Sequence, residues 1–258
     1  MVYLIQNKKL KWFLEYYEAL GIKQECDRLL KKHRPEKIIF ANDHNPYQVA
    51  LKLAAHQNNI KTYFFQHACT ISKMPPLDFT VSFLDGEDSF QKYKSCGPIK
   101  GKVELIGSMM MNTKDQNINE STFVQSIGIA LNEYDKIEDT ILLVDKLKSD
   151  FEGIQIHIRL HPNDKRKFLY KGDNVIIRDS NKDSVFDYLS RIDLLIAGDS
   201  SIHLEATMLN IVAVYYKITV NEVNDIYGFG KNGLVYVSKS YKDLRVYIGK
   251  EVEKKSNV

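Results

Sequence analysis

Apolar and polar residues follow one another along the chain in a pattern that predicts strands and helices in turn. Short apolar runs rich in β-branched and aromatic residues have the length of buried strands, and longer segments with helical spacing of apolar residues separate them. The first part of the chain predicts strands at 37–41, 61–67, 79–84 and 103–106, and helices at 9–32, 47–56 and 88–95. Strands and helices that alternate across short loops are typical of an open parallel sheet covered by helices.

The same alternation restarts after residues 112–122, NTKDQNINEST, which are polar and have no apolar period. Such a composition is typical of a linker. The part that follows predicts strands at 126–131, 154–160, 174–178, 193–197, 211–216 and 234–238, and helices at 137–151, 184–190, 202–209 and 241–250. We therefore predict an α/β protein with two Rossmann-like parallel-sheet domains, residues 1–112 and 113–258, that face each other across a cleft.

A glycine, an aspartate and two serines separate a buried strand from a helix in the second part. These residues are Gly198, Asp199, Ser200 and Ser201. They favour a helix N-cap, and the free N–H groups at a helix start favour an anion such as phosphate. Glu205 lies one helical turn further, on the face of Ser201, where a carboxylate would accept hydrogen bonds from sugar hydroxyls. The turn therefore predicts a nucleotide site with phosphate at the serines and ribose at Glu205. Simple helix capping is the alternative.

A histidine follows another strand of the second part. The segment IQIHIRLHP alternates so that His157 and Arg159 share one face, while His161 emerges at the strand end beside Pro162. If this strand lies near the one before the serines, His161 reaches the same edge of the sheet as Ser200. An imidazole and a helix N-terminus together would hold a phosphate by hydrogen bonds.

Polar side chains also follow three strands of the first part. Asp43 and His44 come after the first strand, His67 after the second and Asp85 after the third. Ligands of open parallel sheets bind outside the carboxyl ends of the strands. These residues are therefore the candidates for a site in the first domain, and exposed loop residues without a role are the alternative.

Composition narrows the possible partners. The net charge of +3 over 258 residues is too small to favour nucleic acid, and the three scattered cysteines favour a reducing compartment over a disulfide framework. Because the sequence has no long apolar run and no secretion-type leader, we expect a cytoplasmic protein. Residues 8–13, KKLKWF, leave open a peripheral contact with the inner face of the membrane, with a solvated helix face as the alternative.

The His161-Pro162 pair and the later stretch GDSSIHLEA resemble the nucleotide-binding half of GT-B glycosyltransferases. The resemblance is to the polysialyltransferase-like and CDP-glycerol glycerophosphotransferase-like groups of bacterial capsule, lipopolysaccharide and teichoic acid assembly. DIYGFGKNG at 225–233 also resembles a donor-facing segment of such enzymes. The resemblance implies that these residues bind the donor: Arg159, His161, Pro162, Gly198, Asp199, Ser200, Ser201 and Glu205.

The first domain resembles the same enzymes at one point. FFQHA at 64–68 is similar to a strand-end motif in which a His-Gly pair supplies a base, although Ala68 replaces the glycine here. The resemblance implies that His67 is a catalytic base, with Asp43 and Asp85 as rivals or orienting groups. It also implies an acceptor-side first domain that is shortened, because MVYLIQNKKL takes the place of an opening strand and a glycine-rich turn.

The sequence contains no DxD triplet, which disfavours a metal-dependent transferase of the GT-A type. It also lacks the Walker, dinucleotide-fold, zinc-protease and α/β-hydrolase motifs. The function predicted is an inverting, metal-independent transfer of a sugar or polyol phosphate from a nucleotide-activated donor to a saccharide or lipid-linked acceptor, without a cofactor. A UDP-N-acetylglucosamine 2-epimerase is one alternative, although that family has adjacent glycines and paired glutamates where this chain has two serines and Glu205. A non-catalytic scaffold of the same fold is the other.

Overall fold

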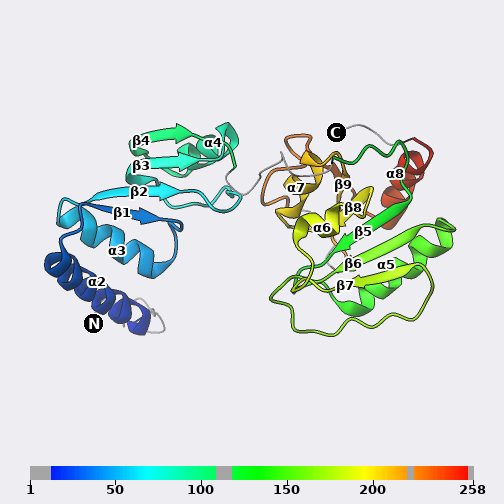
Figure 1. Ribbon diagram of the computed structural model, residues 1–258, viewed down its shortest axis with the longest axis horizontal. Helices are drawn as coiled ribbons and strands as arrows, with labels where there is room; N and C mark the ends of the chain where they lie inside the picture. The colour runs from blue at the N-terminus through cyan, green and yellow to red at the C-terminus, as the bar shows by residue number, and fades with distance from the viewer. Residues whose placement is uncertain (1–12, 109–117, 220–223, 255–258) are drawn as a thin grey trace, which may run out of the picture. The chain divides into compact units, whose positions relative to one another are not determined.

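The computed structural model describes residues 13–108, 118–219 and 224–254 and divides the chain into two compact units (Figure 1). Unit 1 is Met1–Met110 and unit 2 is Met111–Val258, and each is built on a parallel sheet. The prediction of an α/β protein with two parallel sheets is confirmed. Most of the predicted linker, and residues 9–12 of the first predicted helix, lie outside the described residues. No helix in the described ranges is both long enough and apolar enough to span a bilayer.

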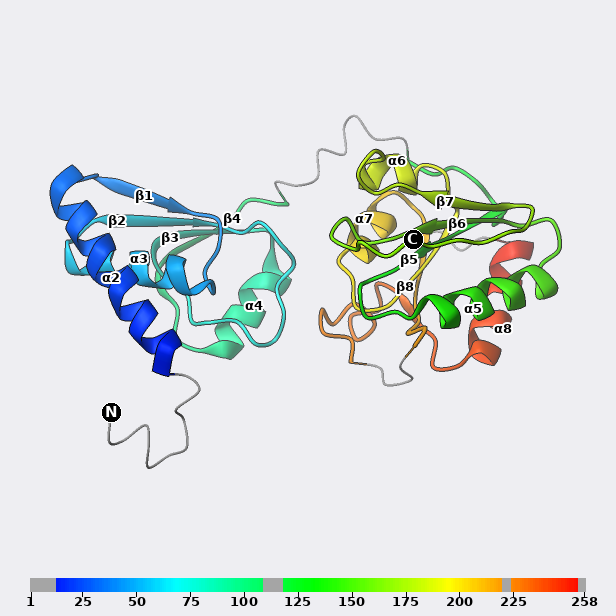
Figure 2. The ribbon, with the colours of Figure 1, turned by 90° about the horizontal axis from the view of Figure 1, so that it is seen from below.

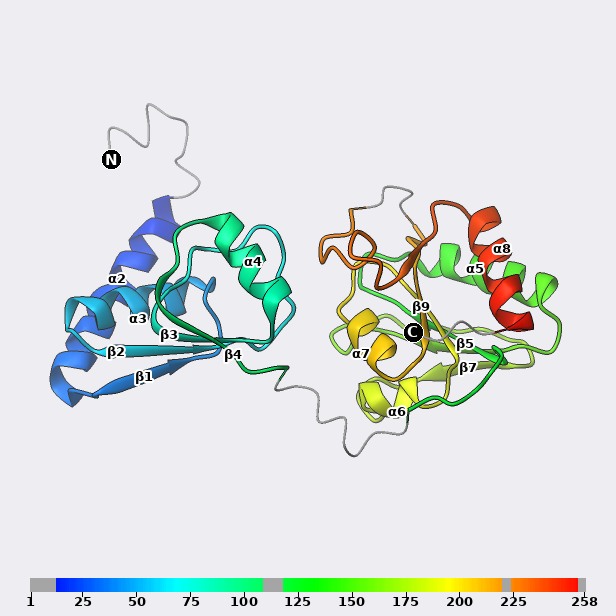
Figure 3. The same cartoon turned by 90° about the horizontal axis from the view of Figure 1, so that it is seen from above.

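Unit 1 is a four-stranded sheet with its strands in the order of the sequence, β1-β2-β3-β4. Its elements are α2 (Phe13–His33), β1 (Lys37–Phe40), α3 (Pro46–Gln57), β2 (Lys61–Phe65), β3 (Asp78–Leu84), α4 (Glu87–Cys96) and β4 (Lys100–Leu105). Since parallel strands are joined by right-handed crossovers, strands that progress in one direction place their helices on the same face. Figures 2 and 3 show α2, α3 and α4 on one side of this sheet.

Aromatic side chains form the core between the sheet and the helices of unit 1. Phe40, Phe64 and Phe79 are almost completely buried, and the rings of Phe64 and Phe79 stack at 5.1 Å. Tyr93 of α4 packs edge-on against Phe64 with 6.3 Å between the ring centroids. This packing fixes α4 against the strands and brings the hydroxyl of Tyr93 to the loop after β1, where it takes part in the candidate site.

Strand β4 starts three residues before the predicted strand at 103–106, because its first residues are polar and give no apolar signal. Gly101 lies in this early part with φ +75°, a conformation that favours glycine. A Cβ atom at Gly101 would lie 1.9 Å from the carbonyl oxygen of Phe79. The backbone of β4 can approach β3 at this position only because residue 101 has no side chain.

Replacing Gly101 by alanine should lower the free energy of unfolding of unit 1 by about 3 kcal/mol, because the left-handed conformation and the backbone clash both oppose a side chain. Hydrogen exchange of the β3 and β4 amides should report the loss, with unit 2 unchanged. Gly107→Ala is the matched control, since Gly107 has φ +78° and no atom within 4 Å of the added Cβ. Equal effects of the two substitutions would show that the clash contributes nothing.

Unit 2 is a six-stranded parallel sheet in the order β10-β9-β8-β5-β6-β7. Its elements are β5 (Ser126–Ala130), α5 (Ile137–Asp150), β6 (Gln155–Arg159), β7 (Val175–Arg178), α6 (Val185–Leu189), β8 (Leu194–Ala197), α7 (Ile202–Met208), β9 (Val212–Tyr215), β10 (Tyr236–Val237) and α8 (Tyr241–Glu253). The chain builds the sheet outward from β5 in one direction through β7, and then returns to build the other half from β8. The order therefore reverses between β5 and β8, as in a doubly wound fold.

Helices cover both faces of the unit 2 sheet. On one face, α5 and α8 pack their apolar residues against the strands, with Leu147 and Ile248 completely buried. Helices α6 and α7 lie on the other face, as Figures 2 and 3 both show. Strand β8 is buried along its whole length, which accounts for its continuous apolar sequence LLIA.

Candidate functional site

The carboxyl ends of three neighbouring strands of unit 2 lie level with one another. In the sheet register, Ala130 of β5 pairs with Arg159 of β6 on one side and with Ala197 of β8 on the other. The next residues are therefore the β5–α5 loop (residues 131–136), the loop that begins at His161, and the β8–α7 turn (residues 198–201). The structure brings the predicted His161 and Ser200 to one edge of the sheet, with β5 between their strands. This edge holds the switch point, where open α/β sheets bind ligands.

The β8–α7 turn leaves one serine hydroxyl unused by the helix. Ser201 is the N-cap residue of α7, but its side chain makes no capping hydrogen bond. The Ser200 hydroxyl accepts from the N–H of Ile202 at 3.5 Å, which is long for such a bond. Gly198 is buried and Ser201 is half-buried. Capping of the helix therefore does not explain why a residue with a hydroxyl group is at position 201.

Asp199 is engaged within the protein. Its carboxylate accepts a hydrogen bond from the hydroxyl of Tyr215 at 2.9 Å and forms an ion pair with the ammonium of Lys217, also at 2.9 Å. The aspartate thus fixes the turn to β9 and holds a lysine beside it, since the Cγ of Lys217 lies 3.7 Å from a Cβ placed on Gly198. Lys217 was not identified from the sequence. Its position as the first cationic residue after β9 was the only signal for it in the sequence.

A buried histidine supports the turn from within. His203 has no exposed surface, and its Nε2 lies 3.2 Å from the carbonyl oxygen of Ala197 and 3.0 Å from that of Gly198. Since carbonyl oxygens only accept, Nε2 carries the proton and donates to both. Burial lowers the pKa of His203 to about 4, so the ring is neutral at pH 7. His203 was also missed, because a histidine on an apolar helix face gives no clear functional signal.

Glu205 lies on α7 one turn after Ser201. Its Oε2 atom is buried and has no hydrogen-bond partner among the described residues, and burial raises the pKa of the carboxyl group. A buried polar atom without a partner is costly unless something else satisfies it. The carboxyl group is therefore suited to receive hydroxyl groups of a ligand, and its predicted contact with a ribose stays a prediction.

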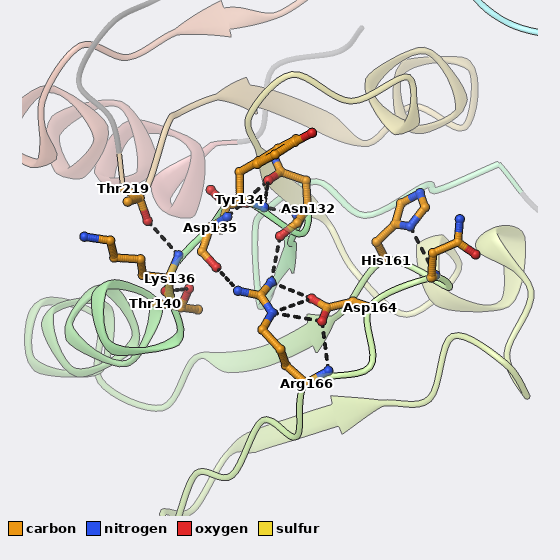
Figure 4. A network of polar contacts seen from close by, with 10 residues as sticks. Asn132, Tyr134, Asp135, Lys136, Thr140, His161, Asp164, Arg166 and Thr219 are labelled. Atoms are coloured by element: carbon orange, nitrogen blue, oxygen red, sulfur yellow. Dashed lines mark hydrogen bonds and ion pairs between the residues drawn. The ribbon is translucent and has the colours of Figure 1, made fainter. Parts of the chain in front are cut away.

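His161 is exposed after β6 and has a defined orientation. Its Nδ1 accepts a hydrogen bond from the N–H of Asn163 at 3.2 Å, as the dashed line in Figure 4 shows. The proton of the neutral ring is therefore on Nε2, which can donate to an anion. Pro162 follows in the same exposed loop.

Arg159 lies away from this open loop. The residue is 7% exposed, its guanidinium carbon is 5.6 Å from the centre of the Tyr188 ring, and its Nη1 has no hydrogen-bond partner among the described residues. Burial lowers the pKa of the Arg159 guanidinium. Its side chain is thus buried against α6, and its predicted contact with a donor remains untested.

Hydrogen bonds from several directions fix the β5–α5 loop (Figure 4). The side chain of Asn132 accepts from the N–H groups of Tyr134 and Asp135 at 2.8 and 3.1 Å. Arg166 donates to the carbonyl oxygens of Asn132 and Asp135 at 3.0 and 2.5 Å, and Asp164 binds the same guanidinium. Sequence reasoning missed Arg166, whose target lies more than thirty residues away. The spacing Asn132-x-x-Asp135 before a helix was an available signal for the loop.

The three catalytic candidates of unit 1 follow neighbouring strands, and one of them forms a pair that sequence reasoning did not predict. Asp43 is 4% exposed, and the hydroxyl of Tyr93 donates to its Oδ2 at 2.6 Å. The Nδ1 of His44 lies 2.9 Å from Oδ1 of Asp43. Since the carboxylate only accepts, Nδ1 carries the proton and Nε2 is the basic nitrogen, with the side-chain amide nitrogen of Asn42 3.5 Å away. The His44 side chain is 59% exposed.

His67 and Asp85 differ from this pair. His67 is exposed after β2. Burial raises the pKa of Asp85 to about 6, and its Oδ2 accepts from the amide of Gln66 at 2.9 Å. Gln66 in turn accepts from the N–H of Asp85 at 3.0 Å. The roles predicted for these two residues stay predictions.

A hollow of about 720 Å³ lies at the opposite, amino end of the unit 2 strands. Asp193, Arg191, Asp150 and Glu152 are among the residues that line it. Asp193 accepts hydrogen bonds from the N–H groups of Gln125 and Ser126, at 3.0 Å each, so it caps the start of β5. Ligands of doubly wound sheets bind at the carboxyl ends of the strands, so this hollow at the amino end is not the expected donor site.

The chain matches no protein-family model and no curated protein sequence. Solved structures resemble it in fold. UDP-N-acetylglucosamine 2-epimerase from Rickettsia bellii is 17% identical, with a TM-score of 0.57 over 93% of this chain and 71% of that one. The calicheamicin glycosyltransferase CalG4 is 11% identical, with a TM-score of 0.63 over 96% and 72%. MurG from Acinetobacter baumannii is 11% identical, with a TM-score of 0.52 over 91% and 68%. At these identities the likeness shows a GT-B-like fold.

Proposed function

We propose that this protein is a metal-independent, inverting glycosyltransferase or polyol-phosphate transferase that uses a nucleotide-activated donor. The level ends of β5, β6 and β8 carry the proposal, because they bring a serine hydroxyl that makes no capping bond, a helix start and an oriented imidazole to one edge. The fold shared with CalG4 and MurG supports a transferase class. We place the activity in the assembly of a bacterial surface polysaccharide of the capsule, lipopolysaccharide or teichoic acid kind, on the resemblance of the HP pair and the serine turn.

The donor phosphate would bind at the β8–α7 turn. The hydroxyl of Ser201 makes no capping bond and the Nε2–H of His161 is not used in the bond to Asn163, so both can donate to it. Such donors stabilise the phosphate most when it departs, since its negative charge then increases. Glu205 would accept hydrogen bonds from the ribose, because its buried oxygen has no other partner among the described residues.

The acceptor hydroxyl needs a base, and the Asp43–His44 pair has the geometry of one. Asp43 is held in place by Tyr93 and orients His44, which presents its Nε2 at an exposed position. In the proposed step, His44 Nε2 takes the proton from the acceptor hydroxyl, the acceptor oxygen bonds to the transferred group, and the bond to the donor phosphate breaks. His67, the base expected from the sequence, has no such orienting partner among the described residues and is the rival.

Calorimetry with CMP, CDP, UDP and GDP tests the phosphate site. At least one of these nucleotides should bind, and Ser201→Ala and His161→Ala should each weaken it about ten- to a hundredfold, the effect of removing one hydrogen bond to a charged group. Ser190→Ala is the matched control, because Ser190 is an exposed serine of the same unit before the amino end of β8.

Three results, from this experiment and from two activity assays, would contradict the proposal. Failure of the wild-type protein to bind any of the four nucleotides would favour a scaffold without catalysis. Conversion of UDP-N-acetylglucosamine to its manno epimer without an acceptor would favour the isomerase. Turnover that is lost on adding EDTA and restored by a divalent metal would contradict the metal-independent mechanism.

A further inference from the structure

The β5–α5 loop presents an aromatic ring at the edge where the donor would bind. Tyr134 is 82% exposed, although it lies in the middle of a loop whose backbone is fixed on all sides. Besides the bonds of Asn132 and Arg166, the N–H of Lys136 donates to the hydroxyl of Thr219 at 2.7 Å. Figure 4 shows the ring extending from the loop on the side away from Arg166.

This combination differs from that of an ordinary surface tyrosine. Exposed loops are usually mobile, and mobility would cost binding energy because the loop must be ordered by the ligand. Here the charged guanidinium of Arg166 and the buried carboxylate of Asp164, 2% exposed, hold the loop before any ligand arrives. A tyrosine on a rigid support offers a large contact surface at a small entropic cost.

The loop lies next to the candidate phosphate site. The side-chain nitrogen of Asn132 is 3.8 Å from a Cβ placed on Gly198, so the β5–α5 loop and the β8–α7 turn are in contact range. Tyr134 is two residues further along the same loop. A group attached to a phosphate at the turn would therefore lie near the loop that carries Tyr134.

The faces of the sheet on which α5 and α7 lie indicate which of the groups attached to the phosphate lies near Tyr134. Chain segments leave the switch point on opposite sides, since α7 covers one face and α5 the other (Figures 2 and 3). Glu205 is on α7, so a ribose at Glu205 places the nucleoside on the α7 side. The opposite end of the same phosphate, which carries the transferred group, then lies on the α5 side, where the loop with Tyr134 begins.

We propose that Tyr134 stacks against the ring of the transferred sugar, and that the donor is therefore a nucleotide linked to a cyclic sugar rather than to an open-chain polyol. This inference rests on the proposed function and narrows it. The face of an aromatic ring is electron-rich and attracts the C–H groups that a pyranose presents on its flat side. An open-chain polyol has no such side and gains little from the ring.

Calorimetry on paired probes tests the proposal: UDP against UDP-N-acetylglucosamine, GDP against GDP-mannose, CMP against CMP-N-acetylneuraminic acid, and CDP against both CDP-glucose and CDP-glycerol. For the nucleotide that binds, Tyr134→Ala should weaken the sugar conjugate about five- to tenfold, in line with the energy of one aromatic contact, and leave the free nucleotide unchanged. Tyr134→Phe, which keeps the ring, should bind the conjugate like the wild type. CDP-glycerol should bind alike to all three proteins.

The outcomes separate this inference from the function on which it rests. If the wild type binds a nucleotide and its sugar conjugate, but Tyr134→Ala weakens neither or weakens both equally, the stacking role is wrong while the nucleotide site stands. A loss confined to CDP-glycerol would also overturn it. If no probe binds the wild type, both the proposed function and this inference fall.

Discussion

Replacement of His44 by glutamine should lower kcat of donor-dependent transfer by a factor of about 10² to 10⁴, the contribution typical of a general base. Glutamine can still donate to Asp43 but cannot take a proton, so the pair keeps its hydrogen bond and loses its chemistry. Asp43 and Tyr93 should keep their contact, and KM for the donor should change little, because His44 lies outside the unit that would bind the nucleotide. The rate at which nucleotide is released from the donor that binds in the calorimetry measures the effect.

The rival base provides the control for this experiment. His67→Gln removes the other exposed histidine of the same edge, and it should leave kcat within about threefold of the wild type if His44 is the base. Asp43→Asn should resemble His44→Gln in part, since it removes the negative charge beside the imidazole and leaves one side-chain oxygen where Tyr93 and His44 use two. A large loss in His67→Gln with normal turnover in His44→Gln would return the role to His67.

Unit 2 should lose about 4 kcal/mol of its free energy of unfolding between pH 6.5 and pH 4.5, because two of its histidines are buried in the neutral form. Burial lowers the pKa of both His157 and His203 to about 4, and the charges of Arg178 and Arg191 contribute at His157. In the unfolded chain a histidine binds its proton near pH 6.5. The unfolded state therefore takes up protons over this range while the folded state does not, and stability falls as the pH falls.

Substitution separates the two contributions. His203→Gln keeps a donor for the carbonyl oxygens of Ala197 and Gly198 but cannot titrate, so it should lose only about 2 kcal/mol over the same range. Hydrogen exchange of the β5 and β8 amides, corrected for the intrinsic effect of pH, measures this loss. Equal pH slopes for the wild type and His203→Gln would show that His203 does not control the acid response.

Unit 1 offers an internal comparison with the opposite sign. The pKa of Asp85 is raised to about 6 in the folded chain, above the ordinary value near 4. Folded unit 1 therefore binds more protons than the unfolded chain between these values, and this carboxyl group favours folding as the pH falls through 6 toward 4. Its contribution disappears above pH 6, so the acid loss of unit 2 should not be shared by the β2 and β3 amides.

The fold and the place of the site were predictable from the sequence because their signals are local. The continuous apolar run of β8 and the Gly-Asp-Ser-Ser turn after it define a buried strand and a helix start without knowledge of the rest of the chain. The position of His161 at a strand end was equally local, and the sheet register confirmed that it shares an edge with the serines. Their roles in binding a donor stay predictions.

What the sequence did not reveal depends on contacts between distant residues. The carboxylate of Asp199 is paired with Tyr215 and Lys217 of the following strand region, and its predicted contact with a donor stays a prediction. Arg166 acts on a loop that precedes it by more than thirty residues, and the orientation of His44 depends on where the side chain of Asp43 points. Periodicity contains no information on these side-chain directions.

The polar sequence of β4, one of the two edge strands of unit 1, also has a consequence for the solubility of the protein. Strand β4 pairs with β3 on one side only, and its pairing with β3 is irregular between Asp78 and Val81. It carries Lys100 and Lys102, which form ion pairs with Asp78 and Glu104. A strand from another molecule that tried to extend the sheet would meet charges and an uneven backbone there. The polar residues that hid β4 from the apolar pattern thus protect this edge of the sheet against intermolecular growth and aggregation.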